Sequence, residues 1–193
     1  MKLETMDIQE FKEKIYPEYV KLFPPSERKS YRTIEKSVRD QVMNLLKIVV
    51  EDQIVGFIIT NSLANNPYLQ LDYLGIFETE QKKGYGSDAI LLLKENSKEF
   101  AGIFIEIEKP GWGENEKENL IRQKRAAFYK SLGFQKLKFD VELYHVRYET
   151  YLLPCTPKPG FSDEEIIEKI FEIYVATIGE KRTQKYCKVM EDQ

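Results

Sequence analysis

The chain of 193 residues is poor in the side chains from which many catalytic centres are built. It contains one histidine, His145, and two cysteines, Cys155 and Cys187. A single histidine argues against a histidine-based triad and against a multi-histidine metal site. The two cysteines are far apart and lack the short spacing of a metal motif. We therefore expect free thiols in a reducing cytoplasm and no bound metal.

Long apolar runs and an excess of one charge are also missing. No stretch approaches the roughly 18 apolar residues of a membrane-spanning helix. The N-terminal stretch MKLETMDIQEFKEK is too acidic and polar for a signal peptide. Acidic and basic residues are interspersed and give a net charge of -3. This balance gives no reason to expect nucleic acid or an anionic membrane as a partner.

The chain does have a hydrophobic share of 42%, which is enough for a sizeable core. Apolar periodicity predicts helices over residues 8–23, 31–43, 85–99 and 116–132. It predicts strands within residues 45–61 (two, around a turn at 51–53), 68–76, 102–108, 134–139 and 141–153. A helix between the third and fourth strands implies a crossover connection. We therefore expect an α/β (α+β) fold with a mixed, mostly antiparallel central sheet and helices on both faces.

The last forty residues differ in character from the rest. Pro154, Pro157 and the pair Pro159-Gly160 predict a linker. Ser162 and Glu165 then predict a capped helix. Its apolar residues recur at helical spacing: Ile166, Ile167, Ile170, Phe171, Tyr174 and Ile178. We expect a main domain over residues 1–153, and a linker and helix over 154–193 that packs on the same domain or on a partner.

Two glycines precede the helix that begins at Tyr85. Gly84 and Gly86 leave backbone N–H groups open at the positive end of that helix, where a phosphate can bind. A Walker motif is missing from the sequence. Gly84, Gly86 and Ala89 also fit the Rossmann pattern G-x-G-x-x-A, with Glu106 at the distance of a ribose-binding acid. The loop FETEQKK separates these glycines from their strand, so a Rossmann-type NAD(P) oxidoreductase is the weaker alternative.

The whole phrase from Gln81 to Gly86 fits Q/R-x-x-G-x-G/A between a strand and a helix. It resembles the acetyl-coenzyme A pyrophosphate loop of the GNAT superfamily of N-acetyltransferases. Three other phrases resemble a bacterial subgroup of that superfamily: FPPSER (23–28), IEIEKP (105–110) and RAAFYKSLGF (125–134). The resemblance covers residues 1–153, in the same order of elements, and leaves the tail outside.

The resemblance implies acetyl-CoA as co-substrate and direct transfer of acetyl to a primary amine of a small molecule or peptide. It assigns cofactor binding to one strand end and the loop that follows it: Ile76, Gln81, Lys82, Lys83, Gly84, Tyr85, Gly86 and Ser87. In such a site the backbone N–H of Ile76 polarises the thioester carbonyl. Gly75 fits a distorted strand there, and it fits equally a strand that admits a close neighbour.

The resemblance also suggests the groups that move protons. Glu106 takes the position of the general base, with Glu108 and Asp72 in reserve. Tyr129 takes the position of the general acid that protonates the departing thiolate. The alternatives are solvated acids at a strand end and an ordinary core tyrosine. One departure is Arg122, which stands where many GNATs have an asparagine that contacts the cofactor, so we do not assign that contact.

Other features leave alternatives open. A non-catalytic acyl-CoA sensor of the same fold would show the same phrases, with the tail helix as its signalling element. Trp112, in the loop 109–115, either lines the acceptor site or is an ordinary loop aromatic. His145 is expected on a strand in a structural role. The tail helix or the last strand offers a contact for a possible homodimer.

Overall fold

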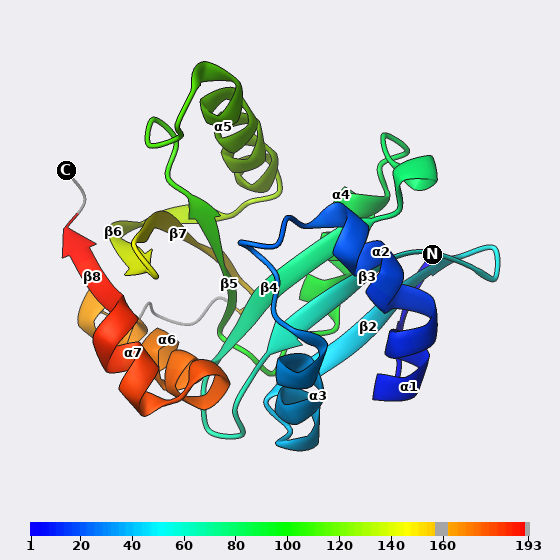
Figure 1. Ribbon diagram of the computed structural model, residues 1–193, viewed down its shortest axis with the longest axis horizontal. Coiled ribbons are helices and arrows are strands. Elements are labelled where there is room, and N and C mark those ends of the chain that lie inside the picture. Colours follow the sequence, from blue (N-terminus) through cyan, green and yellow to red (C-terminus); the bar gives the residue numbers. More distant parts are fainter. Residues whose placement is uncertain (157–161, 192–193) are drawn as a thin grey trace. The chain divides into compact units, whose positions relative to one another are not determined.

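The computed structural model describes residues 1–156 and 162–191, which form two compact units (Figure 1). The first comprises Met1–Ala64 and Leu71–Asn96, and the second comprises Asn65–Gln70 and the chain from Ser97 onward. The second unit therefore continues through residue 153, where the sequence suggested a division. Part of the expected linker, with Pro157 and Pro159-Gly160, lies outside the described residues.

Four neighbouring strands carry the first unit, in the order β1-β2-β3-β4. They are β1 (Lys2–Thr5), β2 (Met43–Val50), β3 (Gln53–Asn61) and β4 (Tyr68–Ile76), of which β4 begins in the second unit. The predicted hairpin between β2 and β3 is confirmed. Its turn residues Glu51 and Asp52 both have positive φ, which suits the twist of a two-residue hairpin turn. Strand β1 was not predicted, because four residues give too little alternation to recognise.

The helical segments of the first unit are short. They are α1 (Ile8–Glu10), the π-helical η1 (Phe11–Ile15), α2 (Tyr16–Leu22), α3 (Tyr31–Arg39), the 3₁₀ turn η2 (Glu78–Glu80) and α4 (Tyr85–Glu95). Asp7 caps α1 by accepting a hydrogen bond from the backbone N–H of Glu10 at 2.7 Å. The helix expected over residues 8–23 continues without a gap from α1 through the π-helical η1 into α2. Pro17, which lacks a backbone N–H, lies in the first turn of α2, directly after the π-helical segment.

Helices cover both faces of these strands. One face carries a cluster of buried residues from helices and strands: Met6, Phe11, Ile15, Tyr19, Ile34, Met43, Leu45, Phe57, Ile59 and Tyr73. Figure 1 shows α1 and α3 in front of β2 and β3. The buried residues of α4 are Ala89, Ile90 and Leu93, which do not belong to this cluster, and α4 runs beside β1. Helix α4 thus covers the opposite face and begins at the glycine-containing loop.

The second unit has the strand order β4-β5-β7-β6-β8, with the start of β4 at one edge. Its other strands are β5 (Gly102–Glu108), β6 (Gln135–Leu143), β7 (Val146–Pro154) and β8 (Cys187–Glu191). β4 and β5 pair in parallel from Tyr68↔Gly102 to Gln70↔Phe104, so the predicted crossover is confirmed. All other recorded pairings in this unit are antiparallel among the described residues. The expected mixed, mostly antiparallel sheet is therefore observed.

The turn between β6 and β7 corrects the sequence analysis. Residues 141–143 belong to β6, and the chain reverses at Tyr144 and His145, which both have positive φ. The expected last strand over residues 141–153 is therefore wrong at its start, and His145 lies in a turn rather than on a strand. The run VELYHVRY contains no glycine, asparagine or proline, so nothing in it signalled the reversal.

Three helices complete the second unit: α5 (Glu116–Ser131), α6 (Asp163–Ile178) and α7 (Glu180–Tyr186). The predicted capping box of α6 is present, because Ser162 and Glu165 each accept from the other's backbone N–H. Gly133, with φ +93°, follows α5 as expected. Helix α7 and strand β8 were not predicted. β8 pairs with β6 and adds a strand from the tail to the sheet.

Helices α5 and α6 lie on opposite faces of β5 and β7 (Figure 1). Tyr151 of β7 is the register partner of Ile105, and Lys130 of α5 lies 5.7 Å from the centre of its ring. Successive strand residues point to opposite faces, so Glu106 points away from α5. Tyr174 of α6 contacts Glu106 there. None of the helices in the described residues combines the length and apolar character needed to cross a bilayer.

Candidate active site

The loop before α4, in the first unit, has the backbone geometry of an anion site. Gly84 has φ +87° and ψ -8°, which is a left-handed conformation, and it is followed by the helical Tyr85. A left-handed residue next to a right-handed one turns successive N–H groups toward a common point. A Cβ built on Gly84 would meet nothing within 4 Å, so the surroundings of this residue are open. Lys82 is also left-handed, with φ +66°, although it is not glycine.

The polar groups of this loop divide into those that hold it and those that remain available. The side-chain amide of Gln81 donates to the carbonyl of Ile76 at 3.1 Å and fastens the loop to the end of β4. Lys83 pairs with Glu80 at 2.9 Å. The backbone N–H of Ser87 donates to the carbonyl of Gly84. Within the described residues, neither the N–H of Tyr85 nor that of Gly86 meets an acceptor, and Lys82 forms no ion pair.

The glycine near the end of β4 serves close packing. A Cβ on Gly75 would lie 2.5 Å from ring atoms of Phe57. A Cβ on Gly56 in β3 would lie 2.4 Å from the carbonyl oxygen of Gly75. Both distances are shorter than real Cβ contacts, so the pair of glycines is required by the approach of β3 to β4. This geometry favours the close-neighbour interpretation of Gly75, and the polarising role of the Ile76 amide stays a prediction.

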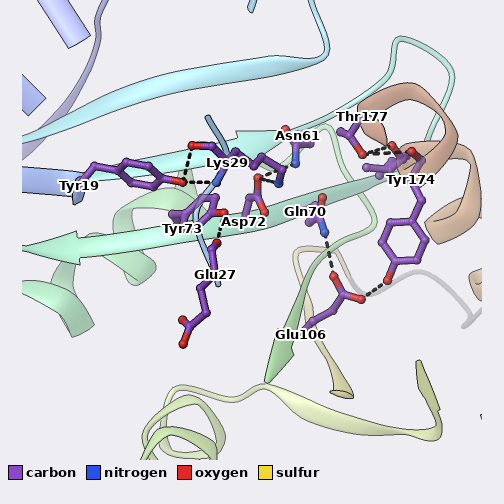
Figure 2. Close-up of polar contacts among 11 residues, drawn as sticks. Tyr19, Glu27, Lys29, Asn61, Gln70, Asp72, Tyr73, Glu106, Tyr174 and Thr177 are labelled. Carbon is purple, nitrogen blue, oxygen red and sulfur yellow. Dashed lines mark hydrogen bonds and ion pairs between the residues drawn. The ribbon is translucent and has the colours of Figure 1, made fainter. Parts of the chain in front are cut away.

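Glu106, in the second unit, accepts a hydrogen bond on each carboxylate oxygen (Figure 2). The hydroxyl of Tyr174 donates to Oε1, and the side-chain amide of Gln70 donates to Oε2 at 2.9 Å. Tyr174 comes from α6 and Gln70 from the start of β4. These donors fix both oxygens of a half-buried carboxylate, and both are neutral groups.

Burial and the charge of Glu106 act on the groups around it. Burial, followed by the nearby charge of Glu106, raises the pKa of the Tyr174 phenol well above its ordinary value. The same two causes raise the pKa of the Cys187 thiol to about 11. Both groups are therefore protonated near neutral pH, and the phenol can act as a donor. Thr150 lies opposite Glu106 in the register of β5 and β7, and its Oγ1 is buried with no partner among the described residues.

The two reserve carboxylates are engaged in ion pairs. Glu108 pairs with Arg122 at 2.9 Å, so the arginine that replaces the family's asparagine contacts an acid of β5. Arg122 also donates to the backbone carbonyl of Lys109. In the first unit, Asp72 pairs with the ammonium of Lys29 and accepts from the side-chain amide of Asn61 at 3.1 Å (Figure 2).

Tyr129 lies on α5, on the face of β5 opposite to Glu106. Its ring packs edge-on against Phe134, with 5.3 Å between the ring centres. Burial raises the pKa of its phenol, and the charge of Arg125 opposes that rise. The phenol is therefore protonated at neutral pH and can donate a hydrogen bond. The structure thus places the two predicted catalytic residues on opposite sides of one strand.

The loop with Trp112 is fixed by a buried ion cluster. The carboxylate of Asp140 accepts from Lys109 at 2.6 Å and from Arg147 at 2.8 Å. Trp112 is 61% exposed and its ring lies 5.0 Å from the Arg147 guanidinium. Asn119 accepts from the N–H groups on either side of Trp112, those of Gly111 and Gly113. The described residues hold no group of acids, histidines and cysteines suited to a metal ion.

Sequence reasoning missed both partners of Glu106. Tyr174 appeared only as one apolar position of the tail helix. Gln70 appeared only as a residue of a β strand. The available signal was a tyrosine on the buried face of a helix, which needs a partner for its hydroxyl. The identity of that partner required the tertiary structure.

No protein-family model matches the sequence, and no curated protein matches it either. Solved structures do match. A protein from Bacteroides thetaiotaomicron described as a GNAT-family acetyltransferase matches with a TM-score of 0.75 and 19% identity, over 93% of this chain and 99% of that one. The ribosomal-protein-S18-alanine N-acetyltransferase from Escherichia coli matches with a TM-score of 0.60 and 15% identity. The match covers 83% of this chain and 97% of that one. An aminoglycoside 6'-N-acetyltransferase complexed with coenzyme A matches with a TM-score of 0.57 and 13% identity. The match covers 83% of this chain and 100% of that one.

The chain has the fold of the GNAT acetyltransferases. The resemblance found in the sequence phrases and the expected fold class are both confirmed at the level of the fold. A Rossmann-type fold is excluded, because that fold is built on a mostly parallel sheet and this sheet is mostly antiparallel. The first match covers 93% of this chain, so it must include part of the tail beyond residue 153.

Proposed function

We propose that the protein is an N-acetyltransferase that moves acetyl from acetyl-CoA to a primary amine of a small molecule or peptide. The observation that carries the proposal is a GNAT fold whose cofactor-loop position holds a left-handed glycine at the start of a helix, with open surroundings. The similar structures include one acetyltransferase complexed with coenzyme A and one that acts on the alanine of a ribosomal protein.

The first unit would bind the cofactor's diphosphate. The amides of Tyr85 and Gly86 are donors at the positive end of α4, and Lys82, three residues before Tyr85, would add positive charge. Gln81 would act indirectly, because its side chain holds the loop to Ile76. We assign Lys83, Gly84 and Ser87 to the same loop, with Gly84 supplying its conformation. The proposed N–H of Ile76 would donate to the thioester oxygen as negative charge develops there.

The second unit would supply the groups that move protons. The amine nitrogen forms a bond to the thioester carbonyl carbon, and the carbon–sulfur bond then breaks. The proton lost by the amine goes to the Glu106 carboxylate, directly or through water. The departing thiolate receives a hydrogen bond and a proton from the Tyr129 phenol, which is protonated at neutral pH.

Binding of acetyl-CoA to the purified chain is the first test. We expect the melting temperature to rise with acetyl-CoA concentration, because a ligand that binds the folded state stabilises it. Reduced nicotinamide cofactor serves as the negative control. No shift at millimolar acetyl-CoA would contradict the proposal.

Release of coenzyme A thiol over a panel of amines, polyamines, aminoglycosides and peptide N-termini is the second test. Rates must be corrected for hydrolysis of acetyl-CoA without an acceptor. An acetyltransferase releases thiol in proportion to acetylated product for at least one amine. Binding without thiol release across the panel would instead indicate the non-catalytic acyl-CoA sensor.

A further inference from the structure

We propose that the C-terminal helix α6 completes the base site, with Tyr174 as the positioning residue that holds the Glu106 carboxylate. The inference rests on the proposed function and adds to it a role for a segment outside the resemblance. Tyr174 touches neither acceptor nor cofactor in this proposal. It acts through the carboxylate that takes the proton.

Helix α6 is fastened to its unit on more than one side. Its buried residues, Ile166, Ile170, Ile173 and Tyr174, recur on one helical face. The side chain of Asn66, which is buried, donates to the carbonyl of Lys169 at 2.8 Å and to the carboxylate of Glu172 at 2.9 Å. Downstream, β8 pairs with β6. The position of the Tyr174 ring is therefore set by packing, and the ring is only 3% exposed.

The hydroxyl of Tyr174 donates a hydrogen bond to Glu106, which a phenylalanine at this position could not do. A phenyl ring would fill the same space, but a buried hydroxyl requires a partner. The hydroxyl donates to Oε1 of Glu106, and the side-chain amide of Gln70 donates to Oε2. One donor on each oxygen fixes the plane of the carboxylate.

Groups from several elements lie around this carboxylate. Tyr174 comes from α6, Gln70 from β4 and Cys187 from the start of β8. Tyr148 of β7 lies near the Tyr174 phenol, and Glu108 follows on the same face of β5. Near neutral pH the Cys187 thiol is protonated, because burial and Glu106 raise its pKa to about 11. The phenol of Tyr174 is protonated for the same reasons. The Cys187 thiol and the Tyr174 phenol thus keep their protons while Glu106 is titrated.

A donor to a carboxylate stabilises its charged form. Removal of the Tyr174 hydroxyl should therefore raise the pH at which Glu106 takes up a proton, by about one unit. Because a base works only when deprotonated, the acidic limb of the kcat/KM profile should move to higher pH by the same amount. A less well-held carboxylate should also lower kcat about tenfold, with the KM for acetyl-CoA changed by less than about twofold.

The test compares Tyr174→Phe with wild type in two measurements. The first is the pH profile of thiol release. The second is the protonation of Glu106 itself, followed by ¹³C NMR of carboxyl-labelled glutamate and assigned with Glu106→Gln. Thr177→Val is the matched control, because its hydroxyl is on the same helix and donates only to the carbonyls of Ile173 and Tyr174 among the described contacts. We expect both midpoints to rise in Tyr174→Phe and to stay unchanged in Thr177→Val.

The outcomes separate this inference from the proposed function. If Tyr174→Phe folds and both midpoints equal those of wild type, the positioning role is wrong, whatever the melting temperature does. If wild type acetylates no amine, the proposed function fails, yet the NMR midpoint still tests the contact. Should Tyr174→Phe fail to fold, 3-fluorotyrosine at position 174 keeps the packing and makes a stronger donor. The Glu106 midpoint must then fall, and an unchanged midpoint overturns the inference.

Discussion

Two carboxylates, one in each compact unit, differ in the groups that surround them. Asp72 in the first unit faces the Lys29 ammonium and the amide of Asn61. Glu106 in the second unit faces a tyrosine hydroxyl and a glutamine amide. Asp72 thus has one charged and one neutral partner. The tyrosine and the glutamine that donate to Glu106 are both neutral groups. The contrast supports the proposal that Asp72 serves the structure and that Glu106 takes the proton.

The largest effect expected is that of Glu106→Gln on turnover. The amide keeps the shape of the side chain but cannot take a proton, so kcat should fall about 10²- to 10⁴-fold. The affinity for acetyl-CoA should be unchanged, as measured by the same thermal shift. Wild-type turnover in this variant would remove Glu106 from the mechanism and end the contrast with Asp72.

Asp72→Asn should act on stability instead. The ion pair is largely buried, with side-chain exposures of 21% for Lys29 and 12% for Asp72. Removal of one partner leaves an uncompensated charge, so we expect a loss of about 2 kcal/mol in the free energy of unfolding. Urea denaturation measures it, and the double variant with Lys29→Met should recover part of the loss. A large drop in kcat at unchanged stability would instead make Asp72 the base.

Tyr129→Phe tests the other face of β5. A thiol has a pKa of about 8.5, so thiolate is a tolerable leaving group and the loss in kcat should be about tenfold to a hundredfold. Burial raises the pKa of Tyr129, so its proton is held through neutral pH and is lost only above its ordinary value of about 10. Deprotonation of Tyr129 should therefore cause no fall in the kcat of the wild-type enzyme below about pH 10. Unaltered turnover in Tyr129→Phe would contradict its role as acid.

Thr150→Val is the smallest change and concerns the strand opposite Glu106. The buried Oγ1 of Thr150 has no partner among the described residues, and an unsatisfied buried hydroxyl costs free energy. The isosteric valine should leave the free energy of unfolding unchanged or raise it by up to about 1 kcal/mol. The melting temperature should accordingly stay the same or rise. A drop in kcat without loss of stability would show that this hydroxyl holds a water for Glu106.

The parts of the fold that the sequence predicted are those with strong local signals. A polar break between two β-rich runs marked the hairpin at residues 51–53. Ser162 with Glu165 marked the capping box, and the readiness of glycine to adopt positive φ marked the Gly84 turn. The strands β1 and β8 were missed because each is short and gains its stability from a neighbour distant in the sequence. The turn at Tyr144 and His145 was missed because its residues are typical of strands.

By itself, the sequence determined the helix starts, the glycine turn before α4 and the alternation that places Glu106 and the isoleucines of β5 on opposite faces. These depend on backbone conformation and on periods of two or 3.6 residues, which are local properties. Only the tertiary structure decided what each side chain meets. It paired Asp72 with Lys29, Arg122 with Glu108 and Tyr174 with Glu106, from segments 43, 14 and 68 residues apart. Such contacts follow from how the elements pack, and no local pattern encodes them.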